Sequence, residues 1–411
     1  MFKIEHSRPI ERMIPASHTE STRMLDAISA AGKVHSDITL KAMTESFPDD
    51  ALNGARQLHQ LCNPEIDPLQ LDAIAAPQAL DPDLDHIMAV HWHPEQVAPE
   101  LALKRFRALY PAAREYILIP TQHNRLTAID GFSGVEIDCR WTGGKLQLLA
   151  HFHGTAAELD AAFLADLERT RRYRNGQLQA FLAALTAQSH SGLRQDLAHD
   201  AGLASAGLAW AEKRAARLGT LLAREQSRLP QDALKNKLVR DWLLLELGGM
   251  GHPQSATLLR WLGLVKEQVK RDFPLDWFLP ASEWIARIHE LGGTVTLPHP
   301  EFFWDALEAG LPLDGVEVWN PQSWRRSEEL LAALVAGRIK GHGGRPVLPT
   351  FGDDCHLGEK LKPLSLQDEE KSGREIGWQP AWDWPGIATL LAQAGWGRRE
   401  LVREWITRLK G

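Results

Sequence analysis

The sequence predicts an α/β protein in which short apolar strands alternate with amphipathic helices. Two stretches carry this alternation, residues 85–154 and residues 279–411. Between them, residues 155–278 are rich in Ala, Leu, Arg and Glu and keep a helical spacing of apolar side chains. Strands that alternate with helices are typical of parallel strands in a barrel or a sheet. We therefore expect one α/β unit that is interrupted by an all-helical insertion.

The first 84 residues are expected to form a helical N-terminal extension. Apolar side chains recur at helical spacing over residues 21–31, and Asp49 or Asp50 could cap a second helix that runs through Cys62. Residues 75–83 contain Pro and Asp residues that are typical of a loop, so we place the border of the main domain there. The expected parts of the chain are residues 1–84, 85–154, 155–278 and 279–411.

The first predicted strand, residues 87–90, leads straight into His91 and His93. Side chains alternate between the two faces of a strand, so both imidazoles would point to the same side at its end. Two imidazoles at this spacing can reach one metal ion. A pair of this kind also occurs among ordinary surface histidines, so its meaning depends on what the rest of the chain brings near it.

Three more strands are expected in the first α/β stretch, over residues 116–119, 134–138 and 146–153. The first of these is almost entirely apolar, as in a parallel sheet that is covered on both faces, and it is followed by His123. The second carries Glu136 in its middle. The third places Gln147, His151 and His153 on one face, because they are separated by even numbers of residues.

The helical insertion carries a run of arginines at positions 169, 171, 172 and 174. These cations could guide an anionic substrate toward a site, or they could form one solvated face of a helix. The insertion shows no other motif that indicates a ligand.

Two strands are expected early in the second α/β stretch, over residues 294–297 and 315–319. The first of them ends just before His299, which stands between two prolines. The second carries Glu317, for which we expect a structural role rather than direct contact with a ligand.

A strand over residues 346–351 leads into a second pair of potential ligands, Asp354 and His356. The two side chains share a face for the same reason as the first histidine pair. Cys355 lies between them, and the alternation turns its side chain toward the core.

Almost all of these candidate ligands follow or end predicted strands, which is where active sites gather in parallel α/β proteins. The candidates are His91, His93, His123, Glu136, His151, His299, Asp354 and His356. Imidazole together with carboxylate suits Zn, Mn or Fe better than Ca or Mg. Eight ligands exceed the needs of one tetrahedral ion, so two or three divalent metal ions are expected. A clustered metal site activates water and can clamp the oxygens of a phosphoryl group.

The order of these motifs resembles the PHP phosphoesterase superfamily (polymerase and histidinol phosphatase). The motifs are HWH, an apolar strand followed by His, GVE, LQLLAHF, TVTLPHP, DGVEVWN and GDDCH, over about residues 85–365. The resemblance is to the branch with a helical insertion, whose members act on nucleoside bisphosphates and on the 5′ ends of oligonucleotides. It implies a distorted (β/α)7-type barrel, a centre of two or three metals, and hydrolysis of phosphate esters.

The resemblance also implies roles for single residues. It makes His91 with His93 the opening metal pair and Asp354 with His356 the closing pair, and it makes Glu136 a carboxylate that bridges two metals. Asp354 would also orient the attacking water, and His123 and His299 would be further ligands.

The sequence departs from the family pattern at two positions. The family usually has Asp where Gln122 stands and His where Gln147 stands. His151, on the same strand face as Gln147, could take its place as a ligand or could be a buried histidine of the barrel. Glu95 is the acidic residue closest after the opening pair.

Arg125 is the predicted phosphate-binding residue, because it follows His123 and a guanidinium suits bidentate contact with phosphate. A solvated surface arginine is the alternative. The candidate catalytic residues are therefore Asp354, Glu136 and Arg125.

Composition limits the setting in which this chemistry would occur. The net charge of −7 gives no overall attraction to nucleic acid. Three cysteines without paired spacing favour a reducing compartment. The charged N-terminus does not resemble a signal peptide, and the sequence contains no run of 18 apolar residues. We expect a cytoplasmic protein that does not contact membranes.

Three functions fit the sequence. The first is a metal-dependent phosphoesterase that acts on a nucleotide, an oligonucleotide end or a small-molecule phosphate. The second is a metal-dependent hydrolase of a substrate without phosphate, since the same ligands serve that chemistry. The third is a non-catalytic binding protein, which the two glutamines would explain. Composition does not determine the oligomeric state.

Overall fold

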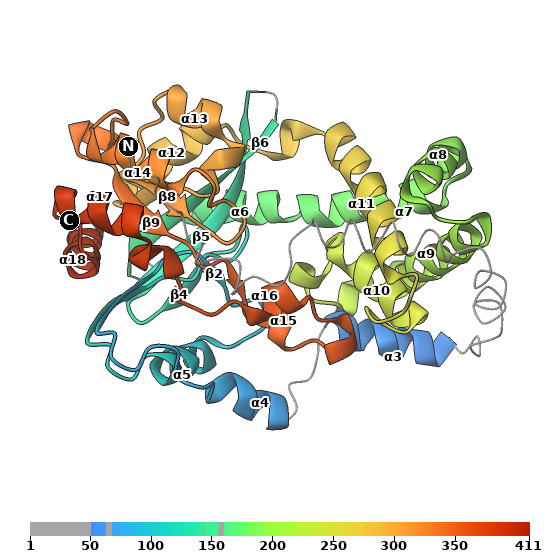
Figure 1. The fold of residues 1–411 in the computed structure, drawn as a ribbon. Coiled ribbons are helices and arrows are strands. Elements are labelled where there is room, and N and C mark those ends of the chain that lie inside the picture. The colour runs from blue at the N-terminus through green and yellow to red at the C-terminus, as the bar shows by residue number, and fades with distance from the viewer. Residues whose placement is uncertain (1–50, 63–67, 143, 155–159) are drawn as a thin grey trace, which may run out of the picture.

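The computed structural model describes residues 51–62, 68–142, 144–154 and 160–411. Figure 1 shows the strands gathered on one side of the molecule, together with the C-terminal helices, and the helical insertion on the other side. The helix expected over residues 21–31 lies outside the described residues. No helix in the described ranges is both long and apolar enough to cross a membrane.

The largest sheet has six strands, which follow one another in chain order. They are β4 (Thr127–Ile129), β5 (Phe132–Trp141), β6 (Gly144–His153), β7 (Thr294–Leu297), β8 (Gly315–Trp319) and β9 (Leu348–Phe351). Strands β4 to β7 pair antiparallel, whereas β7, β8 and β9 pair parallel. The sheet is therefore mixed, and the predicted α/β class is confirmed.

Two short ladders complete the described strands. β1 (His86–Ala89) pairs parallel with β3 (Glu115–Leu118), and β2 (Trp92–His93) pairs parallel with β10 (Cys355–His356). The second ladder joins two segments that lie more than 250 residues apart in the chain, with His356 opposite His93.

The prediction of parallel strands is wrong for β4 to β7, although β1 and β3 pair parallel as expected. The chain turns back directly between Trp141 and Gly144, which pair with each other, so β5 and β6 form a long hairpin. Antiparallel neighbours can be joined by such a tight turn, whereas parallel neighbours need a crossover connection. No ladder among the described strands closes them into a barrel, so the (β/α)7-type barrel is not confirmed.

Most helices outside the insertion lie on the strand side of the molecule, whereas α3 packs against the insertion. The helices outside the insertion are α3 (Ala51–Cys62), α4 (Pro68–Ala75), α5 (Pro99–Leu109), α12 (Ala281–Glu290), α13 (Trp304–Glu308), α14 (Ser327–Val335), α15 (Leu357–Lys360), α16 (Glu369–Gly373), α17 (Pro385–Ala394) and α18 (Arg398–Lys410). The helix expected to run through Cys62 corresponds to α3.

The described residues between Ala161 and Trp277 contain only helices and the turns that join them. The helices are α6 (Ala161–Arg171), α7 (Tyr173–Thr186), α8 (Ser191–Ala201), α9 (Ser205–Glu225), α10 (Lys237–Leu247) and α11 (Ser255–Asp272). A short 3-10 turn, Gln231–Ala233, precedes α10.

Separate apolar clusters stabilise the strand side and the insertion. The fully buried Trp284 and Trp405 pack against the six-stranded sheet. In the insertion, Trp242 and Trp261 are fully buried among leucines, and Leu58 of α3 packs into the same cluster. Burying a tryptophan removes about 150–250 Å² from water, so each ring anchors its cluster.

Candidate metal centre

Side chains from six separate segments of the chain converge on one site. Among the described residues, three groups have ligand atoms that all lie within 4.8 Å of one another. They are His93, His123 and His356; His91, His299 and Glu317; and His91, His93 and Glu136. Because the groups share members, they form one continuous cluster, which we call the metal cluster together with the adjacent Asp354.

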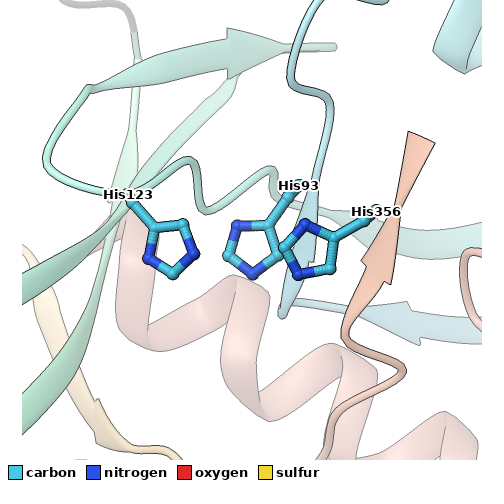
Figure 2. A group of neighbouring side chains, drawn as sticks. All are labelled: His93, His123 and His356. Atoms are coloured by element: carbon cyan, nitrogen blue, oxygen red, sulfur yellow. The ribbon is translucent and has the colours of Figure 1, made fainter. Parts of the chain in front are cut away.

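Three of the rings lie in a row, with His93 between His123 and His356 (Figure 2). The ring centroids are 4.4 Å apart for His93 and His123 and 4.2 Å apart for His93 and His356. The β2–β10 ladder explains the second pair, since it places His356 beside His93. For the first pair, the backbone N–H of Thr121 donates to the carbonyl oxygen of Trp92, which brings the segment of His123 beside that of His93.

Several polar atoms of the metal cluster are buried and form no well-aligned hydrogen bond among the described residues, although His123 Nδ1 and Glu136 Oε2 lie 2.6 Å apart. They are His91 Nε2, both ring nitrogens of His93, His123 Nδ1, Glu136 Oε2 and His299 Nδ1. Buried polar atoms are nearly always paired, because leaving them unpaired costs free energy. Imidazole nitrogens and a carboxylate oxygen are the donors that divalent Zn, Mn and Fe use. The residues therefore fit a divalent metal site.

The protonation of two histidines favours metal binding. Burial lowers the pKa of His93, and the nearby His356 and His123 lower it further. Burial also lowers the pKa of His123, with Arg174 as the next largest cause. Both rings are therefore neutral at pH 7 and keep a free lone pair, which a metal ligand must offer.

Asp354 uses its two oxygens differently. Oδ2 accepts hydrogen bonds from Arg374, with Nη1 at 2.6 Å, and from the side chain of Gln322. Oδ1 faces the cluster, 3.3 Å from His93 Nε2 and 3.4 Å from His356 Nε2. Burial alone would raise the pKa of Asp354, but the bonds to His356 and His93 hold it well below the usual range. An ionised oxygen thus points at the candidate metal site.

Glu317 contacts His91 at Nδ1, the ring nitrogen farther from Asp354. Its Oε1 lies 2.6 Å from His91 Nδ1, and its Oε2 accepts a hydrogen bond of 3.0 Å from the backbone N–H of His299. Metal-binding histidines commonly donate their second N–H to a carboxylate in this way. Burial opposes protonation of His91, but Glu317 outweighs it and raises the pKa to about 10. This geometry agrees with the structural role expected for Glu317, although its oxygens also lie near His299.

Four residues around the cluster have left-handed backbone conformations. They are Glu95 (φ 52°), Asn124 (φ 50°), His299 (φ 46°) and Asp354 (φ 46°), out of six non-glycine residues with positive φ in the described chain. Such conformations cost free energy for residues with a Cβ and persist where the surroundings enforce them. Their concentration here agrees with a functional site.

His151 lies outside the three groups, which corrects its prediction as a ligand. Its Nε2 is 2.9 Å from the carbonyl oxygen of Val90, and its ring packs edge-on against Trp405. Burial lowers the pKa of His151 to about 4, so the neutral ring donates its Nε2 proton to Val90. The alternation along β6 turns this side chain into the core beneath the strand that leads to His91.

Arg125 does not point at the metal cluster either. Its Nη1 lies 2.6 Å from Asp232 Oδ2 in the insertion, and half of its side chain is exposed. Gln122 also has a local partner, since its Oε1 accepts a hydrogen bond of 3.1 Å from the Glu95 backbone. Gln147 lines the pocket described next, and Cys355 is buried in the core as expected.

A pocket of about 770 Å³ opens beside His123, between the strands and the insertion. Its walls carry nine cationic side chains: Lys145, Arg174, Lys235, Lys237, Arg240, Lys266, Lys270, Arg271 and Lys371. None of the described residues that line it is acidic. Some of these cations are balanced from behind the wall, as Lys145 is by Asp138. Burial lowers the pKa of Lys266, and the like charge of Lys270 lowers it further, which indicates crowded positive charge.

The sequence did not predict this pocket. It showed only the run of arginines that includes Arg174. Arg174 lies on α7 beside the metal cluster, and its buried Nε has no partner among the described residues. The nine cations are spread over more than 200 residues, so no local pattern could reveal them.

Comparison with known proteins gives limited similarity. No family model and no curated protein matches this sequence. The structure is similar to a protein from Bifidobacterium adolescentis that is provisionally described as a metal-dependent phosphoesterase, with 16% identity and a TM-score of 0.42 over 76% of this chain and 98% of that chain. It is also similar to an amidohydrolase from Chromobacterium violaceum with bound sulfate and no metal, with 14% identity and a TM-score of 0.38 over 69% and 94%. The PHP resemblance stays a prediction, and the proposal below rests on the geometry of the site.

Proposed function

We propose that this protein is a metal-dependent hydrolase and that its substrate is a phosphate ester. Two neighbouring features of the structure support this proposal. The metal cluster gathers buried donor atoms that form no well-aligned hydrogen bonds, and His123 of the same cluster lines a pocket walled by cations. Metal ligands next to a cationic, anion-free pocket suit a substrate that carries phosphate.

The donors are numerous enough for two divalent ions, and Zn, Mn or Fe would suit them. The group of His91, His93 and Glu136, with Asp354 beside it, would hold one ion. His123 and His356 would supply donors for a second. When bound, the ions would supply Lewis acidity that activates water and stabilises charge on a phosphoryl group.

The remaining chemistry falls to residues of the chain. Asp354 keeps one oxygen directed into the cluster, where it can orient the attacking water. Arg174 takes over the role predicted for Arg125, because it lies beside His123 and has an unpartnered buried Nε. A guanidinium in this position can hold the non-bridging oxygens of a phosphate.

The pocket favours a substrate larger than a simple phosphate. Tyr173, Phe273 and Phe278 contribute rings to the same walls as the cations. Aromatic and cationic side chains together support a nucleotide or the end of an oligonucleotide, since rings stack on bases while cations bind phosphates. A small-molecule phosphate remains within the proposed class.

The test begins with metal content and turnover of the purified chain. Protein isolated without chelator should carry two or more Zn, Mn or Fe ions, measured by elemental analysis. It should hydrolyse members of a panel of phosphate esters that includes mononucleotides and short oligonucleotides. Asp354→Ala should abolish turnover while the circular dichroism spectrum is unchanged. Turnover of amides but of no phosphate ester, by fully loaded protein, would refute the phosphoesterase proposal.

A further inference from the structure

We propose that Lys235 is a positioning residue that connects the helical insertion to the metal cluster. It holds the carboxylate of Glu95, and Glu95 in turn fixes the ring of His356. The inference rests on the proposed metal binding, and it assigns a specific task to a residue of the insertion.

The three side chains form a continuous chain of contacts. Lys235 Nζ lies 3.1 Å from Glu95 Oε1, and the same oxygen lies 3.4 Å from His356 Nδ1. On the other edge of the imidazole, His356 Nε2 lies 3.4 Å from Asp354 Oδ1. The ring is therefore held by a carboxylate on one side while its other nitrogen faces the metal cluster.

The same arrangement occurs at His91, where Glu317 occupies the outer position. A carboxylate behind a metal-binding histidine selects the tautomer and makes the ring a stronger donor. The two carboxylates differ in what holds them. Glu317 is held by the backbone of His299, within the strand side of the molecule. Glu95 is held by a lysine from the insertion.

Glu95 cannot easily move away from this position. Its backbone is left-handed at φ 52°, and its N–H is bonded to Gln122. Its carboxylate packs against Gly358, where an added Cβ would lie 3.0 Å from the Cβ of Glu95 and closer still to Oε2. Gly358 thus leaves the room in which the Glu95 carboxylate sits.

Lys235 also provides the charge that this position requires. The Glu95 side chain is 7% exposed, and a buried carboxylate without a counter-charge is costly. Removing the ammonium of Lys235 therefore weakens the hold of Glu95 on His356 even though Lys235 contacts no proposed metal ligand directly.

The segment that carries Lys235 is itself attached to the strand side by flanking ion pairs. Asp232 pairs with Arg125, and Lys237 pairs with Glu359. The position of the insertion and the orientation of a metal ligand are thus physically connected through one short segment before α10.

The experiment compares metal affinity in three lysine variants of the full chain, with Glu95→Ala, alone and combined with Lys235→Met, as a further comparison. Lys235→Met removes the ammonium but keeps most of the side-chain volume, and Lys235→Arg retains a cation. Lys266→Met is the matched control, because it removes the same charge from the same pocket without contacting Glu95. The probe is Zn²⁺ alone, titrated against a chromogenic chelator, with ions per chain counted by elemental analysis. Circular dichroism and thermal unfolding check that each variant is folded.

We expect Lys235→Met to weaken binding of one ion by roughly tenfold, because it loosens Glu95, and loss of the outer partner of a metal ligand usually costs roughly 10- to 100-fold in affinity. Lys235→Arg should restore most of the affinity, and Lys266→Met should leave it unchanged. Glu95→Ala should weaken the same ion, and combining it with Lys235→Met should add little, since both act through one contact.

Two results would overturn the inference. Equal affinity in Lys235→Met and Lys266→Met would mean that Lys235 contributes only general charge. An additional ion bound by Lys235→Met would mean that Glu95 is itself a ligand that Lys235 blocks. Failure of the proposed function looks different, because the unaltered chain would then bind no metal or hydrolyse no phosphate ester.

Discussion

Replacing Gly352 by alanine tests whether Glu317 shapes the metal cluster. A Cβ added at Gly352 would lie 2.7 Å from Glu317 Cδ and closer still to Oε1, and real Cβ atoms essentially never approach within 3.0 Å. The Glu317 side chain is fully buried and has no free space on that side. The Gly352→Ala variant can therefore fold only if the carboxylate moves.

The expected loss of stability follows from the contacts that Glu317 would lose. Glu317 is bonded to His91 Nδ1 at 2.6 Å and to the His299 N–H at 3.0 Å. A hydrogen bond to a charged group contributes about 1.5–3 kcal/mol, so we expect a loss of roughly 3 kcal/mol in the free energy of unfolding. Because His91 also loses its outer partner, metal affinity should fall by roughly 10- to 100-fold.

Urea unfolding of the metal-free chain and Zn²⁺ titration measure these two effects separately. Gly219→Ala is the control, because Gly219 lies inside α9 with nothing near an added Cβ. Alanine there should stabilise the chain by roughly 0.5–1 kcal/mol through helix propensity. Wild-type stability and wild-type metal affinity in Gly352→Ala would refute the role assigned to Glu317.

Three further predictions test the site and its surroundings. Chelation should lower the melting temperature by at least roughly 2 °C, because a ligand at 100 times its Kd stabilises the folded state by about 2.7 kcal/mol. Readdition of Zn²⁺ or Mn²⁺ should reverse this shift in a thermal scan. Arg174→Met should reduce kcat/KM for a phosphate ester by roughly 10- to 100-fold, because one charge-assisted hydrogen bond contributes about that much. Arg125→Met, the control, should change kcat/KM by less than about threefold in the same steady-state assay. Burial alone would raise the pKa of Glu359, but Lys237 and Lys362 lower it to about 2. The ionised Glu359 therefore stabilises the fold fully above the pKa of an unfolded glutamate, about 4.5. This stabilisation is lost as the pH falls toward 2. The stability difference between the wild type and Glu359→Gln in urea should therefore be about 3 kcal/mol at pH 7 and should shrink below pH 4.5; a constant difference would contradict this reasoning.

The central histidines of the site could be predicted because strand periodicity is a local property. His91 with His93, and Asp354 with His356, are each two residues apart next to strands, so alternation predicts that each pair shares a face. Asp354 departs from strand geometry, with a left-handed backbone at φ 46°, yet its Oδ1 lies 3.4 Å from His356 Nε2. The structure then joins the two pairs through the β2–β10 ladder. The orientation of Cys355 toward the core follows from the same rule.

Other expectations failed because they depend on distant partners. His151 has the correct residue type and strand position for a ligand, but the carbonyl oxygen of Val90 takes its ring proton. Arg125 follows His123 directly, yet Asp232 of the insertion pairs with it. Strand direction was missed where the chain turns back between Trp141 and Gly144, since the apolar pattern of a strand does not reveal the direction of its neighbour.

The sequence by itself determined the α/β class, the helical character of the insertion and the identity of most candidate ligands. These properties follow from residue type and from periodicities of two or about 3.6 residues, which neighbouring residues set among themselves. Only the tertiary structure decided that Glu317 and Glu95 stand behind two of the histidines and that nine cations surround one pocket. Contacts and electrostatic fields depend on distance in space, and the chain brings together residues that are hundreds of positions apart.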